Sequence, residues 1–177
     1  MGKEKNTGIG FFLPLLALAV VVTVGGVLVY GNLPKSPGHG FGGRQDKLLT
    51  KQEVTDFLAE LKKACNRRDL SFFRDHLALD AKITLDQAGR TVRFNTASYL
   101  MNMTKIYDQV NDYSYDQTDP IISLNLNRAM LRFTATETAQ LMGNAVKSET
   151  KTIMEIAKRH DRIFIERISG DVTSKME

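Results

Sequence analysis

The stretch IGFFLPLLALAVVVTVGGVLVY, residues 9–30, sets the architecture of the chain because it contains no charged residue. At about 1.5 Å per residue, a helix over this stretch is roughly 30 Å long, which matches the hydrocarbon core of a bilayer. The sequence therefore predicts one transmembrane helix over residues 9–30. Its predicted membrane-anchoring side chains are Phe11, Phe12, Leu13, Leu15, Leu16, Leu18, Val20, Val21, Val22, Val24, Val27, Leu28 and Val29.

An uncleaved anchor is favoured over a signal peptide, because the apolar run exceeds the roughly 7–15 residues of a signal's apolar region. Its end also has no Ala-x-Ala pattern. Lysines and arginines lie on both sides of the run, so the positive-inside rule barely discriminates between orientations. A tail this short on a single-span protein usually stays in the cytoplasm. We therefore expect a cytoplasmic N-terminus, with the rest of the chain on the periplasmic, extracellular or lumenal side.

Composition divides the 177 residues into five parts. They are a short tail (1–8), the predicted span (9–30), a Gly/Pro-rich linker (31–47), one domain (48–172) and a final tail (173–177). After residue 43 the basic and acidic residues are nearly equal in number and interspersed, which argues against a nucleic-acid partner. Cys65 is the only cysteine, so an internal disulfide is excluded.

Three segments of the domain have the apolar spacing of helices. Thr50 and Glu53 form a capping box at the start of the first. Its predicted buried face comprises Val54, Phe57, Leu58, Leu61, Ala64 and Cys65. A short second helix is predicted over residues 69–77, and a third begins at Asn95 or Thr96.

The remaining segments alternate as strands do. Residues 81–85 and 90–94 form a predicted hairpin, and residues 113–126 form a strand that Pro120 interrupts. In residues 129–138 one face carries Ala129, Leu131, Phe133 and Ala135. Two further strands, 149–159 and 162–168, form a hairpin that turns at His160 and Asp161.

This order of helices and strands, with short motifs that include FLAEL (57–61), NRRDL (66–70) and RHDRI (159–163), resembles the nuclear transport factor 2-like, or SnoaL-like, superfamily. The resemblance covers about residues 48–170. It implies a cone-shaped α+β fold, in which a strongly curved antiparallel sheet packs on about three helices. The chain departs from the family at its last turn, where members commonly have Asp-Gly and an aromatic residue, often Trp, and this chain has His160-Asp161 and no Trp.

A transmembrane helix before this fold is similar to the architecture of inner-membrane scaffolds of type IV secretion systems and of accessory proteins of lipid-importing complexes. The analogy implies a single-pass, membrane-anchored scaffold that is a non-catalytic subunit of a membrane complex, with other proteins of that complex as partners. By resemblance alone, a homodimer through the sheet face is also expected. Arg128, Arg132 and Lys158 are the predicted interaction face. The alternative is a membrane-tethered small-molecule-binding protein, or an isomerase- or cyclase-like enzyme, that uses the cone.

No motif assigns catalytic, cofactor-binding or metal-binding residues, so we expect none. Asp75 and His76 are adjacent on a helix and do not face each other. Tyr99 and Tyr107 are expected to pack in the core or line the cone. Glu137 falls in register with the inward face of its strand. It is the one candidate for a buried carboxylate, although a surface residue at the strand end is favoured.

Asp108, Asp112, Asp116 and Asp119 cluster between the third helix and the next strand. Acidic clusters can bind a hard cation through oxygen ligands. Their spacing matches no calcium loop, and Asp is common in turns and at helix ends. An ordinary solvated turn is therefore favoured over a metal site.

Overall fold

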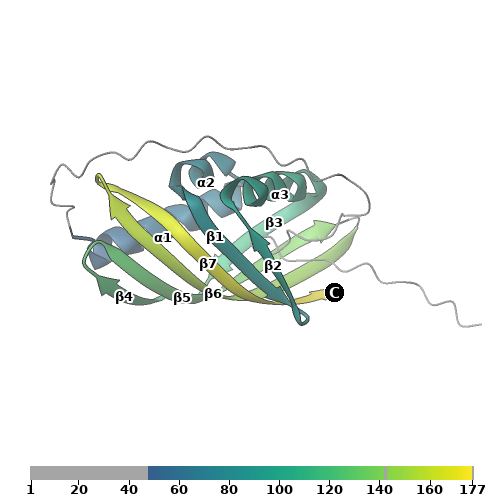
Figure 1. Ribbon diagram of the computed structural model, residues 1–177. Helices are drawn as coiled ribbons and strands as arrows, with labels where there is room; N and C mark the ends of the chain where they lie inside the picture. Colours follow the sequence, from purple (N-terminus) through teal and green to yellow (C-terminus); the bar gives the residue numbers. More distant parts are fainter. Residues whose placement is uncertain (1–47, 142, 177) are drawn as a thin grey trace, which may run out of the picture.

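The computed structural model describes residues 48–141 and 143–176, which form three helices and a seven-stranded sheet (Figure 1). The predicted N-terminal tail (1–8), anchor (9–30) and linker (31–47) lie outside these residues. The helices are α1 (Lys51–Arg67), α2 (Leu70–His76) and α3 (Thr96–Gln109). The strands are β1 (Leu77–Gln87), β2 (Arg90–Phe94), β3 (Val110–Gln117), β4 (Ile121–Asn125), β5 (Arg128–Leu141), β6 (Asn144–Arg159) and β7 (Arg162–Met176).

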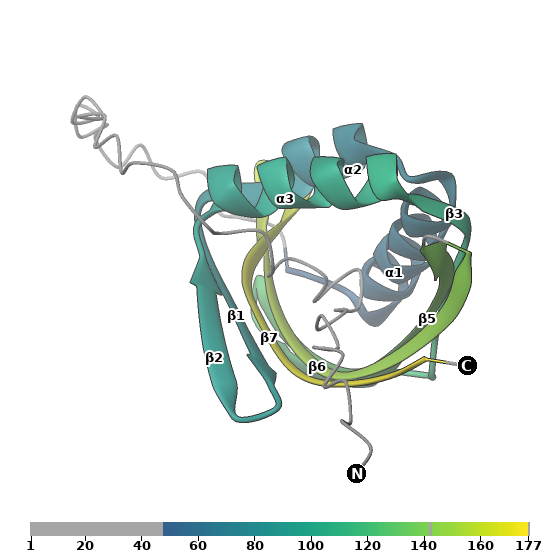
Figure 2. The same ribbon diagram turned by 90° about the vertical axis from the view of Figure 1, so that its right-hand side faces the viewer.

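The strands lie side by side in the order β2-β1-β7-β6-β5-β3, and β4 pairs with another part of β5. All pairs are antiparallel except β1 with β7, which is parallel. Figure 2 shows the sheet bending around α1, with α2 and α3 lying across its open side. The α+β class expected from the sequence is thus confirmed.

The capping box at the start of α1 forms as predicted. The Thr50 hydroxyl accepts the backbone N–H of Glu53 at 3.2 Å, and the Glu53 carboxylate accepts the backbone N–H of Thr50 at 2.9 Å. The apolar face predicted for this helix is buried. Each of its large side chains contributes roughly 1.5–3 kcal/mol by leaving water, so packing holds the helix more strongly than its cap does.

The other predicted elements are present, with adjusted ends. Asp69 caps α2, and Asn95 rather than Thr96 caps α3. The predicted interruption at Pro120 separates β3 from β4. β7 continues to Met176 and so includes residues 173–176, which the sequence assigned to a tail.

Alternation along β5 and β6 decides which side chains face the helices. Ala129, Leu131, Phe133 and Ala135 are buried as predicted, and Arg128 and Arg132 are exposed. Lys158 was expected on the exposed face, and that expectation is wrong, because only 6% of the residue is exposed. It shares the inward phase of β6 with Met154 and Ile156, and its ammonium pairs with Glu53 at 2.5 Å.

Candidate functional site

A buried carboxylate lies on the inner face of the sheet, the face that packs against the helices. Glu137 follows the inward phase of β5 and is 3% exposed. Its neighbours in register are Tyr115 on β3 and Ser148 on β6, which are also buried. The surface position that the sequence favoured for Glu137 is therefore wrong, and the buried carboxylate, its alternative, is what the structure shows. Burying such a group is costly unless hydrogen bonds compensate, so its partners matter.

Tyr113 on β3 supplies one such hydrogen bond. Its hydroxyl donates to Oε1 of Glu137 at 2.9 Å. The register of β3 against β5 shifts between Asn111 and Ser114, and Asp112 in this bulge has a φ of 47°. A β-bulge turns the side chains that follow it, and here it directs Tyr113 towards Glu137.

Glu137 acts electrostatically on several groups around it. Burial raises the pKa of the Tyr113 hydroxyl, and the nearby charge of Glu137 raises it further. The same two causes, in the same order, raise the pKa of the Cys65 thiol well above its ordinary value. Cys65 therefore stays a neutral thiol packed in the core, as the sequence predicted, and is not an activated nucleophile.

Tyr99 on α3 has a hydroxyl in an unusual position. The residue is fully buried, and its hydroxyl has no hydrogen-bond partner among the described residues. Burial, followed by the proximity of Cys65 and then Glu137, raises its pKa. Buried hydroxyls are nearly always paired, so an unpaired one indicates a place for a water molecule or a ligand atom.

Small polar side chains continue this cluster across the inner face. The hydroxyl of Ser148 on β6 donates to that of Ser174 on β7 at 2.9 Å, and Gln87 on β1 donates to the same Ser174 oxygen at 3.2 Å. Thr150 and Thr152 on β6 are also buried. This part of the inner face is therefore lined by short hydroxyl-bearing residues instead of large apolar ones.

Arg68 holds the neighbouring backbone in place. It ends α1 in the left-handed conformation, with a φ of 55°. Its guanidinium donates to the carbonyl oxygen of Val110 at 2.9 Å and lies 6.0 Å from the centre of the Tyr113 ring. It thereby ties the end of α1 to the junction of α3 and β3, directly before the bulge.

This arrangement has the parts of an acid–base site. A buried carboxylate can accept a proton from a substrate. The Tyr113 hydroxyl holds that carboxylate with its one O–H, and the Tyr99 hydroxyl can donate a hydrogen bond to an oxygen or a leaving group. Because Glu137 is 3% exposed, a ligand reaches it only when packed neighbours move. Within residues 48–141 and 143–176, no group of His, Cys, Asp and Glu could hold a metal ion.

The structure separates the other residues that the sequence singled out. Asp75 is exposed, whereas a ring nitrogen of His76 donates to the carbonyl oxygen of Ile163 at 2.7 Å. Tyr107 packs in the core near Tyr113, with 5.8 Å between ring centres. In the acidic cluster, Asp116 accepts a hydrogen bond from Lys62 at 2.6 Å.

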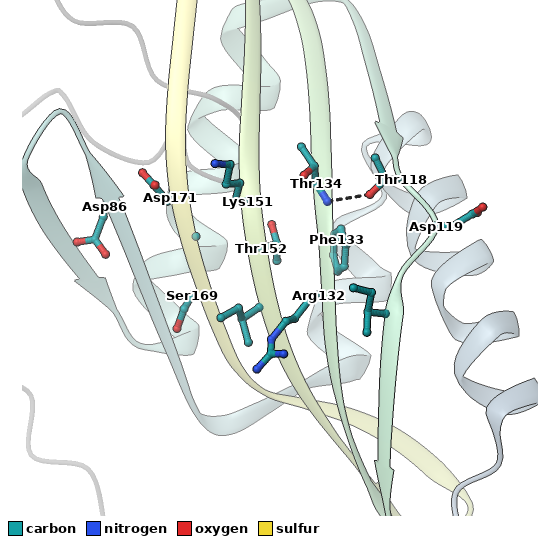
Figure 3. A pocket seen from close by; sticks show the side chains of 13 residues that line it. Asp86, Thr118, Asp119, Arg132, Phe133, Thr134, Lys151, Thr152, Ser169 and Asp171 are labelled. Carbon is teal, nitrogen blue, oxygen red and sulfur yellow. Dashed lines mark hydrogen bonds between the residues drawn. The ribbon is translucent and has the colours of Figure 1, made fainter.

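A groove of about 550 Å³ lies on the outer face of the sheet, away from Glu137 (Figure 3). The β1–β2 hairpin flanks it on one side and the β3–β4 link on the other. Register places Thr134, Lys151, Asp171 and Asp86 in one row across four strands. Arg132, from the predicted interaction face, lies in the groove beside its register partners Ile121 and Ile153.

The chemistry of this groove is weaker than that of the inner cluster. Three carboxylates and two cations line an open surface, where water screens their charges. Glu137 and Tyr113 meet instead in the buried interior, where Tyr99 is also fully buried and where electrostatic effects on a reacting group are much larger. We therefore take the inner cluster as the candidate site.

Comparisons with known proteins give similarity in structure only. No protein-family profile and no curated protein sequence matches the chain. A protein proposed to be a scytalone dehydratase, from Novosphingobium aromaticivorans, covers 70% of this chain and 85% of its own, with 8% identity and a TM-score of 0.61. The hexachlorocyclohexane dehydrochlorinase LinA-type3 from Novosphingobium barchaimii covers 70% and 87%, with 10% identity and a TM-score of 0.58.

A nuclear transport factor 2-like superfamily protein from Salmonella enterica covers 68% of this chain and 88% of its own, with 15% identity and a TM-score of 0.58. Identities this low show the fold alone. The chain therefore has a nuclear transport factor 2-like α+β fold, as the resemblance in sequence implied.

The expected role as a non-catalytic scaffold subunit of a membrane complex is contradicted. The structures that share the fold over most of the chain include two proteins named for enzymatic reactions. Among the residues that the structure describes, none of the helices is long and apolar enough to span a membrane. The predicted span, residues 9–30, lies outside the described residues.

Proposed function

We propose that this protein binds a small, uncharged organic molecule inside its curved sheet and acts on it by acid–base chemistry. One arrangement carries the proposal. The carboxylate of Glu137 is buried and accepts a hydrogen bond from Tyr113, and the hydroxyl of Tyr99, whose pKa is raised by burial, then by Cys65 and also by Glu137, has no hydrogen-bond partner among the described residues. In this proposal the interior of the sheet is the cone that the sequence resemblance implies. Glu137 is the base, Tyr113 holds its carboxylate, and Tyr99 is the hydrogen-bond donor to the substrate.

The reaction class follows from these groups. Glu137 takes a proton from a carbon or hydroxyl of the substrate, and the electron pair left behind moves into a neighbouring bond. A leaving group departs, or an oxyanion forms, at the position that the Tyr99 hydroxyl addresses. The dehydratase and dehydrochlorinase with the same fold are both named for elimination reactions, which need such a base.

Charge selects the substrate class. A carboxylate that acts as a base is ionised when the substrate binds, so in this proposal an anionic ligand is repelled while a neutral one with a hydrogen-bonding group is accepted. The inner face of β6 and β7 is closely packed, since a Cβ at Gly170 would lie 2.8 Å from Thr150, so such a molecule enters only when packed neighbours move.

Residues 9–30 are part of the proposal as a membrane tether for this domain, on the periplasmic, extracellular or lumenal side. The uncharged run in the sequence supports the tether. We expect the full-length protein to stay in the membrane pellet after alkaline carbonate extraction. Its release into the supernatant would contradict the membrane tether.

Binding can be tested by methyl NMR of the full chain in detergent micelles. Met103 lies on the inner face of α3, one turn from both Tyr99 and Tyr107, whereas Met101 on the same helix is 58% exposed. We expect 4-nitrobenzyl alcohol to shift the Met103 signal saturably and to leave Met101 unchanged. The anion 4-nitrobenzoate, with the same ring, should shift neither. If the neutral probe leaves Met103 unmoved, the interior is not a binding site.

A further inference from the structure

Two exposed leucines meet at the end of the domain where the described chain begins. Leu48 is 63% exposed and Leu126, in the turn between β4 and β5, is 71% exposed. The backbone joins them closely, because the N–H of Leu49 donates to the carbonyl oxygen of Leu126 at 2.9 Å. An isolated exposed leucine is ordinary, but an adjacent pair at one end of a molecule indicates a contact surface.

Leu126 also adopts an unfavourable backbone conformation. Its φ is 54°, in the left-handed region, where Asn and Gly are common and Leu is rare. Asn125 and Asn127 flank it. Asparagine, which tolerates a positive φ, therefore stands on both sides of Leu126, while the residue that has the positive φ is a leucine. The turn thus holds an apolar side chain in water despite backbone strain, as functional positions often do.

Basic side chains surround the two leucines. Lys51 is exposed in the first turn of α1, where the helix dipole disfavours a cation. Arg128 and Arg159, from β5 and β6, are exposed at the same end and both pair with Glu166. Lys158 N–H donates to the carbonyl oxygen of Asn127 at 2.7 Å, which places the β6–β7 turn beside the β4–β5 turn. This end, which we call the basic leucine tip, thus has more cations than anions.

The tip lies where the sequence would hold it against a bilayer. Residues 31–47 separate the uncharged run from Leu48, and their Gly/Pro-rich composition predicts a mean end-to-end distance of roughly 20–25 Å for a segment of that length. In Figure 1 the β4–β5 turn and the start of α1 lie at one end of the sheet, and the C-terminal end of β7 lies at the other. A tether this short keeps the tip close to the surface that anchors it.

We propose that the basic leucine tip docks on the membrane, with Leu48 and Leu126 in the interfacial layer and Lys51, Arg128 and Arg159 facing anionic lipid headgroups. Apolar side chains beside cations are the combination that binds such surfaces. The inference rests on the tether of the proposed function and not on chemistry at Glu137. Docking fixes the orientation of the domain relative to the bilayer.

The absence of tryptophan from the chain allows a direct test. The full-length variant Leu126→Trp is reconstituted in vesicles of phosphatidylcholine and phosphatidylglycerol whose acyl chains carry bromine, a contact quencher. Met176→Trp is the matched control, because Met176 is 50% exposed at the far end of β7. We expect bromine to lower the tryptophan emission of Leu126→Trp at least about two-fold, since interfacial side chains lie roughly 5–10 Å deep, and to leave the emission of Met176→Trp almost unchanged.

A second variant separates lipid docking from other contacts. Adding Lys51→Glu to Leu126→Trp favours the helix dipole, so folding is preserved, and we expect it to reduce quenching. If Leu126→Trp has the same tryptophan emission with and without bromine, the proposal is overturned. This holds both for protein that is associated with the vesicles and for protein that is not. Emission changes that follow protein concentration and not bromine also overturn it and assign the tip to a second copy of the chain. Binding of 4-nitrobenzyl alcohol in micelles does not depend on any of these outcomes.

Discussion

The hydroxyl of Tyr113 on β3 donates a 2.9 Å hydrogen bond to the carboxylate of Glu137 on β5, inside the curved sheet. The two residues are 24 positions apart and meet because a bulge at Asp112 shifts the register of β3. The contact partly compensates the burial of a carboxylate that the fold would otherwise exclude. The contact joins Glu137, the candidate base, to the hydroxyl of Tyr113.

Removal of this contact should destabilise the domain. Tyr113→Phe leaves a buried carboxylate without that donor, and hydrogen bonds to charged groups contribute about 1.5–3 kcal/mol. Tyr115→Phe is the control, because the Tyr115 hydroxyl donates to the neutral amide oxygen of Gln117 and should contribute only about 0.5–1.5 kcal/mol. Urea denaturation of both variants measures the difference, and equal losses would contradict the assigned role of Tyr113.

The ion pair between Lys158 and Glu53 should make stability depend on acid pH. The pKa of Glu53 is lowered from 4.5 to about 2, first by Lys158 and then by the Thr50 backbone. A lowered folded-state pKa means that stability is fully present above the unfolded value. We therefore expect the free energy of unfolding to fall between about pH 5 and pH 2 as Glu53 takes up a proton.

Lys158→Met is the matched variant for this pH dependence. It keeps an apolar stem in a position that is 6% exposed and removes the main partner of Glu53. Because the Glu53 side chain is 38% exposed, solvent screening limits the pH-dependent contribution to about 1 kcal/mol. Unfolding of the variant, followed by circular dichroism, should depend less on pH over this range. Parallel curves for the two proteins would show that other carboxylates control the acid transition.

Thr50→Ala should lower stability by about 0.5–2 kcal/mol, because it removes the acceptor for the backbone N–H of Glu53. Thr55→Ala provides the control within α1. The Thr55 hydroxyl only bonds back to the carbonyl oxygen of Lys51, so alanine there should be neutral or slightly stabilising. Denaturant midpoints of the two variants should therefore move in different directions or by clearly different amounts.

Leu126→Asn should stabilise the domain by about 0.5–1 kcal/mol, since asparagine tolerates a φ of 54° better than leucine. The same change should weaken contact of the tip with lipid. A thermal midpoint that falls instead would mean that Leu126 packs against the domain and is not retained for an external contact.

Local patterns in the sequence predicted much of this fold. The capping box of α1 and the alternation of β5 need only short-range rules, and both are as predicted. Glu137 could be identified as a possible buried carboxylate because it keeps the phase of Leu131 and Phe133. The parallel pairing of β1 with β7 joins residues about 90 positions apart, and no local pattern indicates it.

The partners of Glu137 were harder to predict. No residue type marks the bulge at Asp112, so the face of β3 on which Tyr113 lies could not be determined. The alternation of β6 places Lys158 among the inward-facing residues. A buried lysine can be predicted only when its charged partner is known, and here the partner, Glu53, precedes it by 105 residues. Arg68, Ser148 and Ser174 gave no signal, because their contacts also depend on tertiary pairing.

The measurement that tests the central claim most directly is the charge preference of the interior with and without Glu137. In the wild type we expect 4-nitrobenzyl alcohol to bind at least about ten-fold more tightly than 4-nitrobenzoate, a difference of about 1.4 kcal/mol. Glu137→Gln keeps the shape of the side chain and removes its charge, so the ratio of the two dissociation constants, read from the Met103 signal, should fall to about one. A ratio that is unchanged in Glu137→Gln would show that the carboxylate does not face the ligand, and the proposed site would be wrong.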